Sequence, residues 1–177
     1  MAAGVDRSKQ GSVDKDIEPL LEKLNSSGYQ TTSSCSGRIV LLRLDENRRK
    51  DRCEWLYKTH HTANPAEVFR ILEKSQERLW FMQEPVIVHV NCPSLEKAGQ
   101  LLEAAKKAGF KHSGIFSLKN FSVEIRGSER MEALLVPGLS KGYIEELVEE
   151  ANRRLGKAKE KMERLMKIVS NHEPSIR

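Results

Sequence analysis

The sequence is poor in cysteine, and its few thiols form no recognisable pattern. Cys35, Cys53 and Cys92 are odd in number and widely spaced, which argues against a disulfide framework and favours a reducing compartment, the cytoplasm. The chain contains no Cys-x-x-Cys and no His-x-x-x-His pair. Because zinc sites usually carry such local ligand pairs, we predict no bound metal.

Long apolar runs and glycine-rich nucleotide loops are also missing. No stretch approaches the roughly 20 apolar residues of a membrane span, and the first residues lack the apolar core of a signal peptide. We therefore expect a soluble cytoplasmic protein without a membrane partner. Neither a Gly-x-Gly-x-x-Gly fingerprint nor a Walker A loop is present, which argues against a Rossmann cofactor site and against a P-loop.

Basic charge is present in modest excess. The 177 residues carry a net charge of +5 and are 31% charged, which suggests an anionic partner, nucleic acid first. A solvated surface is the ordinary explanation of basic clusters, and contact with phosphate is the more specific one. The three clusters are Arg48, Arg49, Lys50 and Arg52; Lys106, Lys107 and Lys111; and the basic residues of a C-terminal helix, Arg153 to Lys167.

Apolar periodicity predicts a succession of helices and strands. The first helix is expected to be capped by Asp14 or Asp16 and to end at Gly28. Further helices are expected from Asn64, from Ser94 to Gly109 and over about 141–169. The predicted strands are 38–44, 53–60, 78–83, 84–91, 114–118 and 121–127. The run Val86 to Val90 is apolar except for His89, which is typical of a central strand.

Two segments share one layout. Each contains Leu-Leu-Glu in a predicted helix, then glycine and an aromatic residue, then a small polar turn and a strand. The glycines stand at positions 28 and 109, and the Leu-Leu-Glu triplets begin at 20 and 101, so both offsets are 81. Matching offsets predict an internal duplication with pseudo-repeat halves at about 13–62 and 86–138.

The segment TTSSCSGRI (31–39) places small hydroxyl and thiol side chains before an apolar strand. In a turn such hydroxyls commonly satisfy backbone groups, which explains one or two of them. The alternative is a turn that binds a polar ligand, since glycine allows close backbone approach and arginine meets a carboxylate or phosphate. The candidates are Thr32, Ser33, Ser34, Cys35, Gly37 and Arg38. No nearby histidine would activate Cys35, so we expect a small buried thiol rather than a nucleophile.

Four further polar residues stand in apolar surroundings: Asp14, His60, His89 and Arg126. Each has an ordinary structural explanation. Asp14 can cap a helix, His89 can be a satisfied core or barrel-lining histidine, and Arg126 can be a surface residue at a strand end. Singly, none of them specifies a site.

Taken in order, six segments resemble the tRNA wybutosine-synthesizing protein 3 family over nearly the whole chain. They are KQGSVDKDI, TTSSCSGRI, WLYKTH, EPVIVHVNC, AGFKHSGI and VEIRGSE. The resemblance implies an S-adenosylmethionine-dependent methyltransferase that acts on a ring nitrogen, N-4, of a tricyclic 4-demethylwyosine-type guanosine derivative. That base lies next to the anticodon of tRNA-Phe. The short chain looks like the archaeal branch, whose base already carries an aminocarboxypropyl group.

The resemblance also implies an α+β, non-Rossmann fold. Two β-α repeats would form a mixed, barrel-like sheet with helices packed outside and a long C-terminal helix. We expect one methyltransferase domain over residues 1–177. The sequence specifies no protein partner or oligomeric state, and a monomer is the default expectation.

The implied reaction assigns expected roles to the candidates. Methyl transfer needs the donor and the acceptor nitrogen close together, and a general base to take the acceptor's proton. The candidate bases are Asp14 and His60, with His89 third. The turn from Thr32 to Arg38 and the matching turn of Ser113, Gly114 and Ile115 would hold the cofactor or the base. Arg38 and Arg126 would meet the donor's carboxylate or tRNA phosphate.

A non-catalytic RNA-binding module is the alternative, because a basic, duplicated α+β domain suits it equally well. Such a module uses surface aromatic residues to stack bases. Aromatic residues make up only 6% of this chain, and most fall in core-patterned runs. This distribution favours the enzyme.

Overall fold

A computed structural model describes residues 13–44 and 53–170 of the chain. The described strands form two four-stranded sheets, and every strand pair in them is antiparallel. The predicted α+β class and long C-terminal helix are confirmed. The predicted single barrel-like sheet is wrong, because strands 78–83 and 84–91, although adjacent in sequence, pair in different sheets.

The sheets belong to two compact units, each assembled from separate stretches of chain. The first unit takes the described residues 13–36, 85–128 and 158–170, and the second takes 37–44, 53–84 and 129–157. The helix α4 (Lys141–Ser170) contributes its first part to the second unit and its last part to the first. The predicted sequence halves do not have these boundaries, and the duplication stays a prediction.

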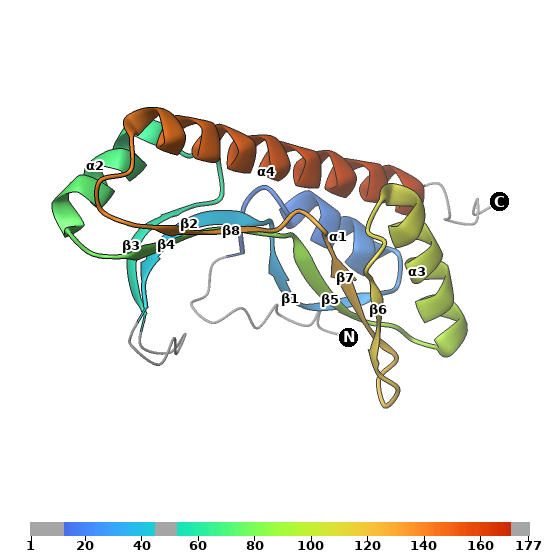
Figure 1. Ribbon diagram of the computed structural model, residues 1–177. Helices are drawn as coiled ribbons and strands as arrows, with labels where there is room; N and C mark the ends of the chain where they lie inside the picture. The colour runs from blue at the N-terminus through green and yellow to red at the C-terminus, as the bar shows by residue number, and fades with distance from the viewer. Residues whose placement is uncertain (1–12, 45–52, 171–177) are drawn as a thin grey trace. The chain divides into compact units, whose positions relative to one another are not determined.

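The first unit contains a sheet with one face covered by helices (Figure 1). In sheet order its strands are β1 (Gln30–Cys35), β5 (Ile87–Asn91), β7 (Ser122–Arg126) and β6 (Gly114–Ser117). Its helices are α1 (Glu18–Ser26), α3 (Leu95–Ala108) and the last part of α4. Val88, Val90, Val123 and Ile125 are fully buried against them. Alternate residues of the same strands lie on the other face, which carries polar side chains.

The second unit has a sheet of its own, with the order β3 (Glu54–Thr59), β2 (Arg38–Arg43), β4 (Leu79–Glu84) and β8 (Met131–Leu135). Helix α2 (Pro65–Ser75) and the first part of α4 pack against Ile39, Leu41 and Phe81. The predicted strands 38–44 and 53–60 are confirmed, and they form the antiparallel pair β2–β3. The basic cluster between them, Arg48 to Arg52, lies outside the described residues.

Local capping explains where several helices begin and end. The Ser94 hydroxyl accepts the Lys97 N–H at 3.1 Å at the start of α3, and Gly109 ends that helix with φ of 107°. Both were predicted. The predicted cap of α1 is wrong, because its N-cap is Ile17 and no side chain bonds there. Pro19 stands in the first turn of the helix, where its missing N–H would have no partner within the helix.

The segment 30–35 is the strand β1 rather than the predicted turn. β1 pairs antiparallel with β5, which lies far along the chain: Ser34 stands opposite Val88, and the register shifts between Thr31 and Ser33. The turn itself is short and contains Gly37, whose φ of 84° favours glycine. Because side chains alternate along a strand, the hydroxyl groups of β1 divide between the two faces of the sheet.

No helix among the described residues has the length and apolar character that crossing a membrane requires.

Candidate functional site

His89 lies on the exposed face of the first sheet between a hydroxyl and a carboxylate. Its Nδ1 is 2.7 Å from Ser33 Oγ on β1, and its Nε2 is 3.0 Å from a carboxylate oxygen of Glu124 on β7. The three residues are direct neighbours across the paired strands β1, β5 and β7. The His89 and Glu124 side chains are 32% and 30% exposed, so a ligand can reach them.

Further side chains extend this arrangement. The Arg126 guanidinium lies 3.7 Å from the other Glu124 oxygen and is 41% exposed. The Phe116 ring on β6 packs against the His89 ring at 5.0 Å, and Phe116 is 60% exposed. Cys35 pairs with Ile87 one row further along the same face. We call Ser33, Cys35, His89, Phe116, Glu124 and Arg126 the polar face of the first unit.

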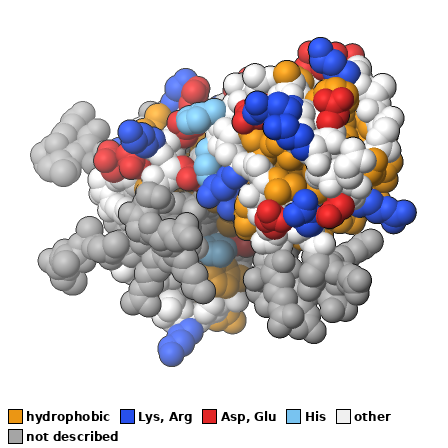
Figure 2. All heavy atoms as spheres, turned by 90° about the vertical axis from the view of Figure 1, so that its left-hand side faces the viewer, with side chains coloured by type: hydrophobic (Ala, Val, Ile, Leu, Met, Phe, Trp, Pro, Cys, Tyr) orange, Lys and Arg blue, Asp and Glu red, His pale blue; other side chains and the backbone are white. Residues whose placement is uncertain are grey.

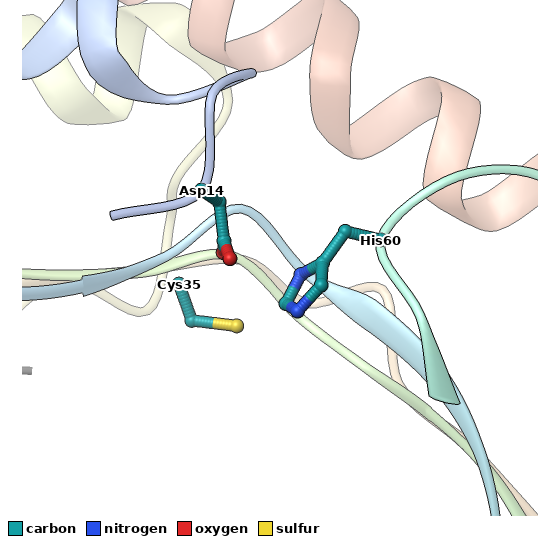
Figure 3. Close-up of side chains that lie close together, drawn as sticks. All are labelled: Asp14, Cys35 and His60. Carbon is teal, nitrogen blue, oxygen red and sulfur yellow. The ribbon is translucent and has the colours of Figure 1, made fainter. Parts of the chain in front are cut away.

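Asp14 orders the end of β1 within the same unit. One of its carboxylate oxygens accepts the Ser36 N–H at 2.9 Å and the Ser36 hydroxyl at 3.1 Å. A carboxylate oxygen of Asp14 and Cys35 Sγ lie within 4.8 Å of each other (Figure 3). Ser36 is fully buried, so Asp14 satisfies polar groups that water does not reach. The third residue that Figure 3 labels, His60, belongs to the second unit.

Replacing Asp14 with alanine should lower the free energy of unfolding by about 1–3 kcal/mol, because two buried donors of Ser36 lose their acceptor. Asp14→Asn keeps an acceptor oxygen and should recover most of that loss. Urea titration followed by circular dichroism measures both, with Glu22→Ala, an exposed residue of α1, as the control. Equal stability of Asp14→Ala and the wild type would contradict this structural role.

The second unit contains three of the candidates: Gly37, Arg38 and His60. His60 Nδ1 donates to the Gly37 carbonyl oxygen at 3.0 Å, which leaves the neutral ring's lone pair on Nε2. The Arg38 guanidinium forms an ion pair with Glu84 and lies 4.9 Å from the centre of the Trp55 ring. Arg38 is therefore already held by two partners before any ligand binds.

The remaining candidates have structural partners in the first unit. The Thr32 hydroxyl donates to the His89 carbonyl oxygen at 3.3 Å. Ser113 donates to the Phe110 carbonyl oxygen at 2.9 Å and accepts the Arg126 N–H at 3.2 Å, so it joins the matching turn to β7. Ile115 packs against the core. Ser34 pairs with the buried Val88 and lies on the core side of the sheet, away from the polar face.

Sequence reasoning missed Glu124 and Phe116. Glu124 stands two residues before Arg126 in a predicted strand, so alternation would have placed both on one face. Although most aromatic residues fall in core-patterned runs, Phe116 is 60% exposed and Trp55 is 46% exposed. Surface aromatic residues are thus available for base stacking.

The basic residues of α4 are largely compensated. Hydrogen bonds from Arg153 and Arg154 lower the pKa of the Glu150 carboxyl. Lys159 forms an ion pair with Asp16, which precedes α1. On the face shown in Figure 2, basic side chains lie among acidic ones rather than in one uninterrupted patch. These pairs are the ordinary structural explanation of this cluster.

Cys92 should resist alkylation in the folded protein. Burial raises the pKa of its thiol to about 11, which lowers the thiolate fraction at pH 8 by about 100-fold. We expect iodoacetamide to modify Cys92 at least about tenfold more slowly than Cys35 or Cys53 at pH 8, as measured by mass spectrometry of digested protein. Unfolding in guanidinium chloride should remove the difference, and an equally fast reaction without denaturant would refute it.

The same thiol has a consequence for stability. Unfolded Cys92 ionises above about pH 8.5, whereas the folded thiol keeps its proton to a higher pH. The free energy of unfolding therefore falls as the pH rises through this range, because ionisation of the thiol stabilises only the unfolded state.

Comparisons with known proteins assign the chain to a family. The family model described as Methyltransferase TYW3 matches residues 1–171. A protein of Pyrococcus horikoshii named tRNA(Phe) 7-((3-amino-3-carboxypropyl)-4-demethylwyosine(37)-N(4))-methyltransferase 1 is 40% identical over 165 residues, which cover 89% of this chain and 84% of that protein. The tRNA wybutosine-synthesizing protein 3 homolog of Xenopus laevis is 36% identical over 92% of this chain and 69% of its own length.

Two solved structures are also similar to this chain. The structure of the PH1069 protein from Pyrococcus horikoshii matches with a TM-score of 0.83 at 40% identity, covering 91% of this chain and 87% of that one. A structure from Aeropyrum pernix, titled a hypothetical protein, matches with a TM-score of 0.77 at 30% identity, covering 89% of this chain and 98% of that one.

Proposed function

Because the chain belongs to the methyltransferase TYW3 family, as its ordered segments predicted, we propose that it methylates N-4 of the tricyclic 4-demethylwyosine-type base in tRNA-Phe. The relatives' names state this reaction, and similarity extends over nearly the whole chain. S-adenosylmethionine is the methyl donor in this proposal, and tRNA-Phe is the macromolecular partner. The observation that carries the proposal is the family match over residues 1–171.

The chemistry of the polar face fits this donor. An amino-acid carboxylate needs a cation, and Arg126 is 41% exposed beside Glu124. A purine ring needs a flat apolar surface, and the exposed Phe116 ring offers one to the donor's adenine or to a tRNA base. Ser33 adds a hydroxyl at the same place. These groups support a site for both a nucleoside and a charged ligand on the polar face.

His89 is the favoured general base among the three candidates. S-adenosylmethionine would supply the methyl group as a sulfonium, while the protein must remove one proton from the acceptor nitrogen. The His89 ring is held by Ser33 and Glu124 and is one-third exposed, so it can receive that proton directly or through its neighbour. Asp14 and His60 stay alternatives. The Asp14 carboxylate already accepts a hydrogen bond from the Ser36 N–H. The neutral His60 ring donates from Nδ1 to the Gly37 carbonyl oxygen, so Nε2 is its basic nitrogen.

The other candidates keep more limited proposed roles. Thr32, Ser34, Gly37, Ser113, Gly114 and Ile115 would shape the site through backbone groups, since several of their side chains have structural partners. Arg38 would contact a carboxylate or phosphate only by exchanging Glu84 for it. Cys35 would line the site with its side chain.

The antiparallel sheets of the described residues support a cofactor site that is not of the Rossmann type, because that site needs parallel strands. We also propose the cytoplasm as the location, a monomer, no metal requirement and one duplicated methyltransferase domain.

A methylation assay tests the function. The substrate is tRNA-Phe that stops just before this methylation, and mass spectrometry of the digested nucleosides reads the product. A gain of one methylene mass on the tricyclic base in the presence of S-adenosylmethionine supports the proposal. Folded protein that binds this tRNA without any gain would leave the non-catalytic RNA-binding module as the function.

A further inference from the structure

Three side chains on neighbouring strands form one hydrogen-bonded chain across the polar face. Ser33 Oγ lies 2.7 Å from His89 Nδ1, and His89 Nε2 lies 3.0 Å from Glu124. We propose that Ser33, His89 and Glu124 are a proton relay, in which Ser33 takes the proton of the acceptor nitrogen and passes its own to His89. This inference rests on the proposed methyl transfer and adds Ser33 as a catalytic residue and Glu124 as a positioning residue.

The hydrogen-bond partners fix the tautomer of His89. An ionised carboxylate only accepts hydrogen bonds, so Nε2 must carry the proton that it donates to Glu124. In the neutral ring Nδ1 then has the lone pair and accepts the Ser33 hydroxyl proton. The Arg126 guanidinium lies 3.7 Å from the other Glu124 oxygen, so the carboxylate also has a cation beside it. The arrangement is therefore set to receive a proton at Nδ1, on the side of Ser33.

The transfer conserves protons and electrons. The acceptor N–H bond breaks, and its electron pair stays on nitrogen while the nitrogen's lone pair forms the new bond to the methyl carbon. The electron pair of the broken S–C bond remains on the donor's sulfur. The released proton binds Ser33 Oγ as the hydroxyl's original proton moves to His89 Nδ1. The resulting imidazolium is stabilised by Glu124 and returns its proton to solvent after the product leaves.

The fold suits a relay better than a purely structural network. All three residues stand on paired strands, which hold side chains more firmly than loops do. The Phe116 ring at 5.0 Å restricts the orientation of the imidazole. Yet His89 and Glu124 are about one-third exposed, whereas a network that only stabilised the core would be buried. A base stacked on Phe116 would stand beside this hydroxyl and imidazole.

The relay is tested by single-turnover methylation of tRNA-Phe with Ser33→Ala, Ser33→Thr and Glu124→Gln. We expect Ser33→Ala to lower the rate by about 100-fold, and Ser33→Thr, which keeps a hydroxyl, to recover it to within about threefold. Ser122→Ala is the matched control, because it removes a hydroxyl of the same sheet that bonds the Asn91 amide instead of an imidazole. It should leave the rate within about twofold of the wild type.

A readout independent of activity is the ¹⁵N NMR spectrum of histidine-labelled protein, which distinguishes the two neutral tautomers. Wild-type His89 should be protonated at Nε2, and Glu124→Gln should reduce that preference while lowering the methylation rate at least about tenfold. Wild-type rates in Ser33→Ala and Glu124→Gln would overturn the relay. If the wild type does not methylate this tRNA, the proposed function fails separately, and an Nδ1-protonated His89 would then overturn the relay as well.

Discussion

Replacing His89 with glutamine should lower the single-turnover rate of methyl transfer by about 100-fold or more, the usual contribution of a general base. Glutamine approximates the size of imidazole and can hydrogen-bond to Ser33 or Glu124, but it cannot take up a proton at neutral pH. Circular dichroism should show an unchanged fold. The loss should appear in the rate at saturating tRNA and donor, rather than in the affinity for either.

The same assay compares the three candidate bases. His60→Gln and Asp14→Asn should each cost less than His89→Gln, and the exposed His112→Gln serves as the control. If His60→Gln gave the largest loss and His89→Gln kept the wild-type rate, the base would be His60. The relay through Ser33 would then be wrong.

Replacing Phe110 with alanine should lower the free energy of unfolding by about 3–5 kcal/mol, because a large side chain leaves a cavity in a close-packed core. Phe110 is fully buried against α1, α3 and the last part of α4. A loss of this size is a large part of the roughly 5–15 kcal/mol that stabilises an ordinary domain. Urea unfolding followed by far-ultraviolet circular dichroism measures it.

Phe116→Ala is the matched control for that experiment. The two phenylalanines are six positions apart, but Phe116 is 60% exposed. Its loss should change the free energy of unfolding by no more than about 0.5 kcal/mol and should instead weaken tRNA binding. Equal destabilisation by both substitutions would show that Phe116 belongs to the core, and the stacking role of the polar face would be withdrawn.

Local signals in the sequence predicted most of the helices and several strands. Ser94 and Gly109 mark α3 because capping depends on neighbouring residues alone. Two strands were missed for opposite reasons. β1 has small polar residues without hydrophobic alternation, and β8 reads Met-Glu-Ala-Leu-Leu, which favours a helix. Pairing with β5 and with β4 overrides both local tendencies.

The site was less predictable because its contacts are distant in sequence. Asp14 was expected to cap the helix that follows it, but its carboxylate bonds Ser36 instead, 22 residues away. Ser33 and His89 meet only because β1 and β5 pair in one register, which no local pattern specifies. His89 was identified as a candidate from its apolar context, whereas its partner Glu124 looked like any exposed carboxylate of a strand.

The path of the chain through the first unit constrains how the protein can be made. Synthesis proceeds from the N-terminus, yet the core around Ile17 and Leu24 also needs Met162 and Leu165 of α4, which the ribosome adds much later. The apolar side chains of the N-terminal segment therefore stay exposed until α4 has been made. We expect aggregation during expression to depend more on how fast the ribosome reaches the end of α4 than on the stability of the folded protein.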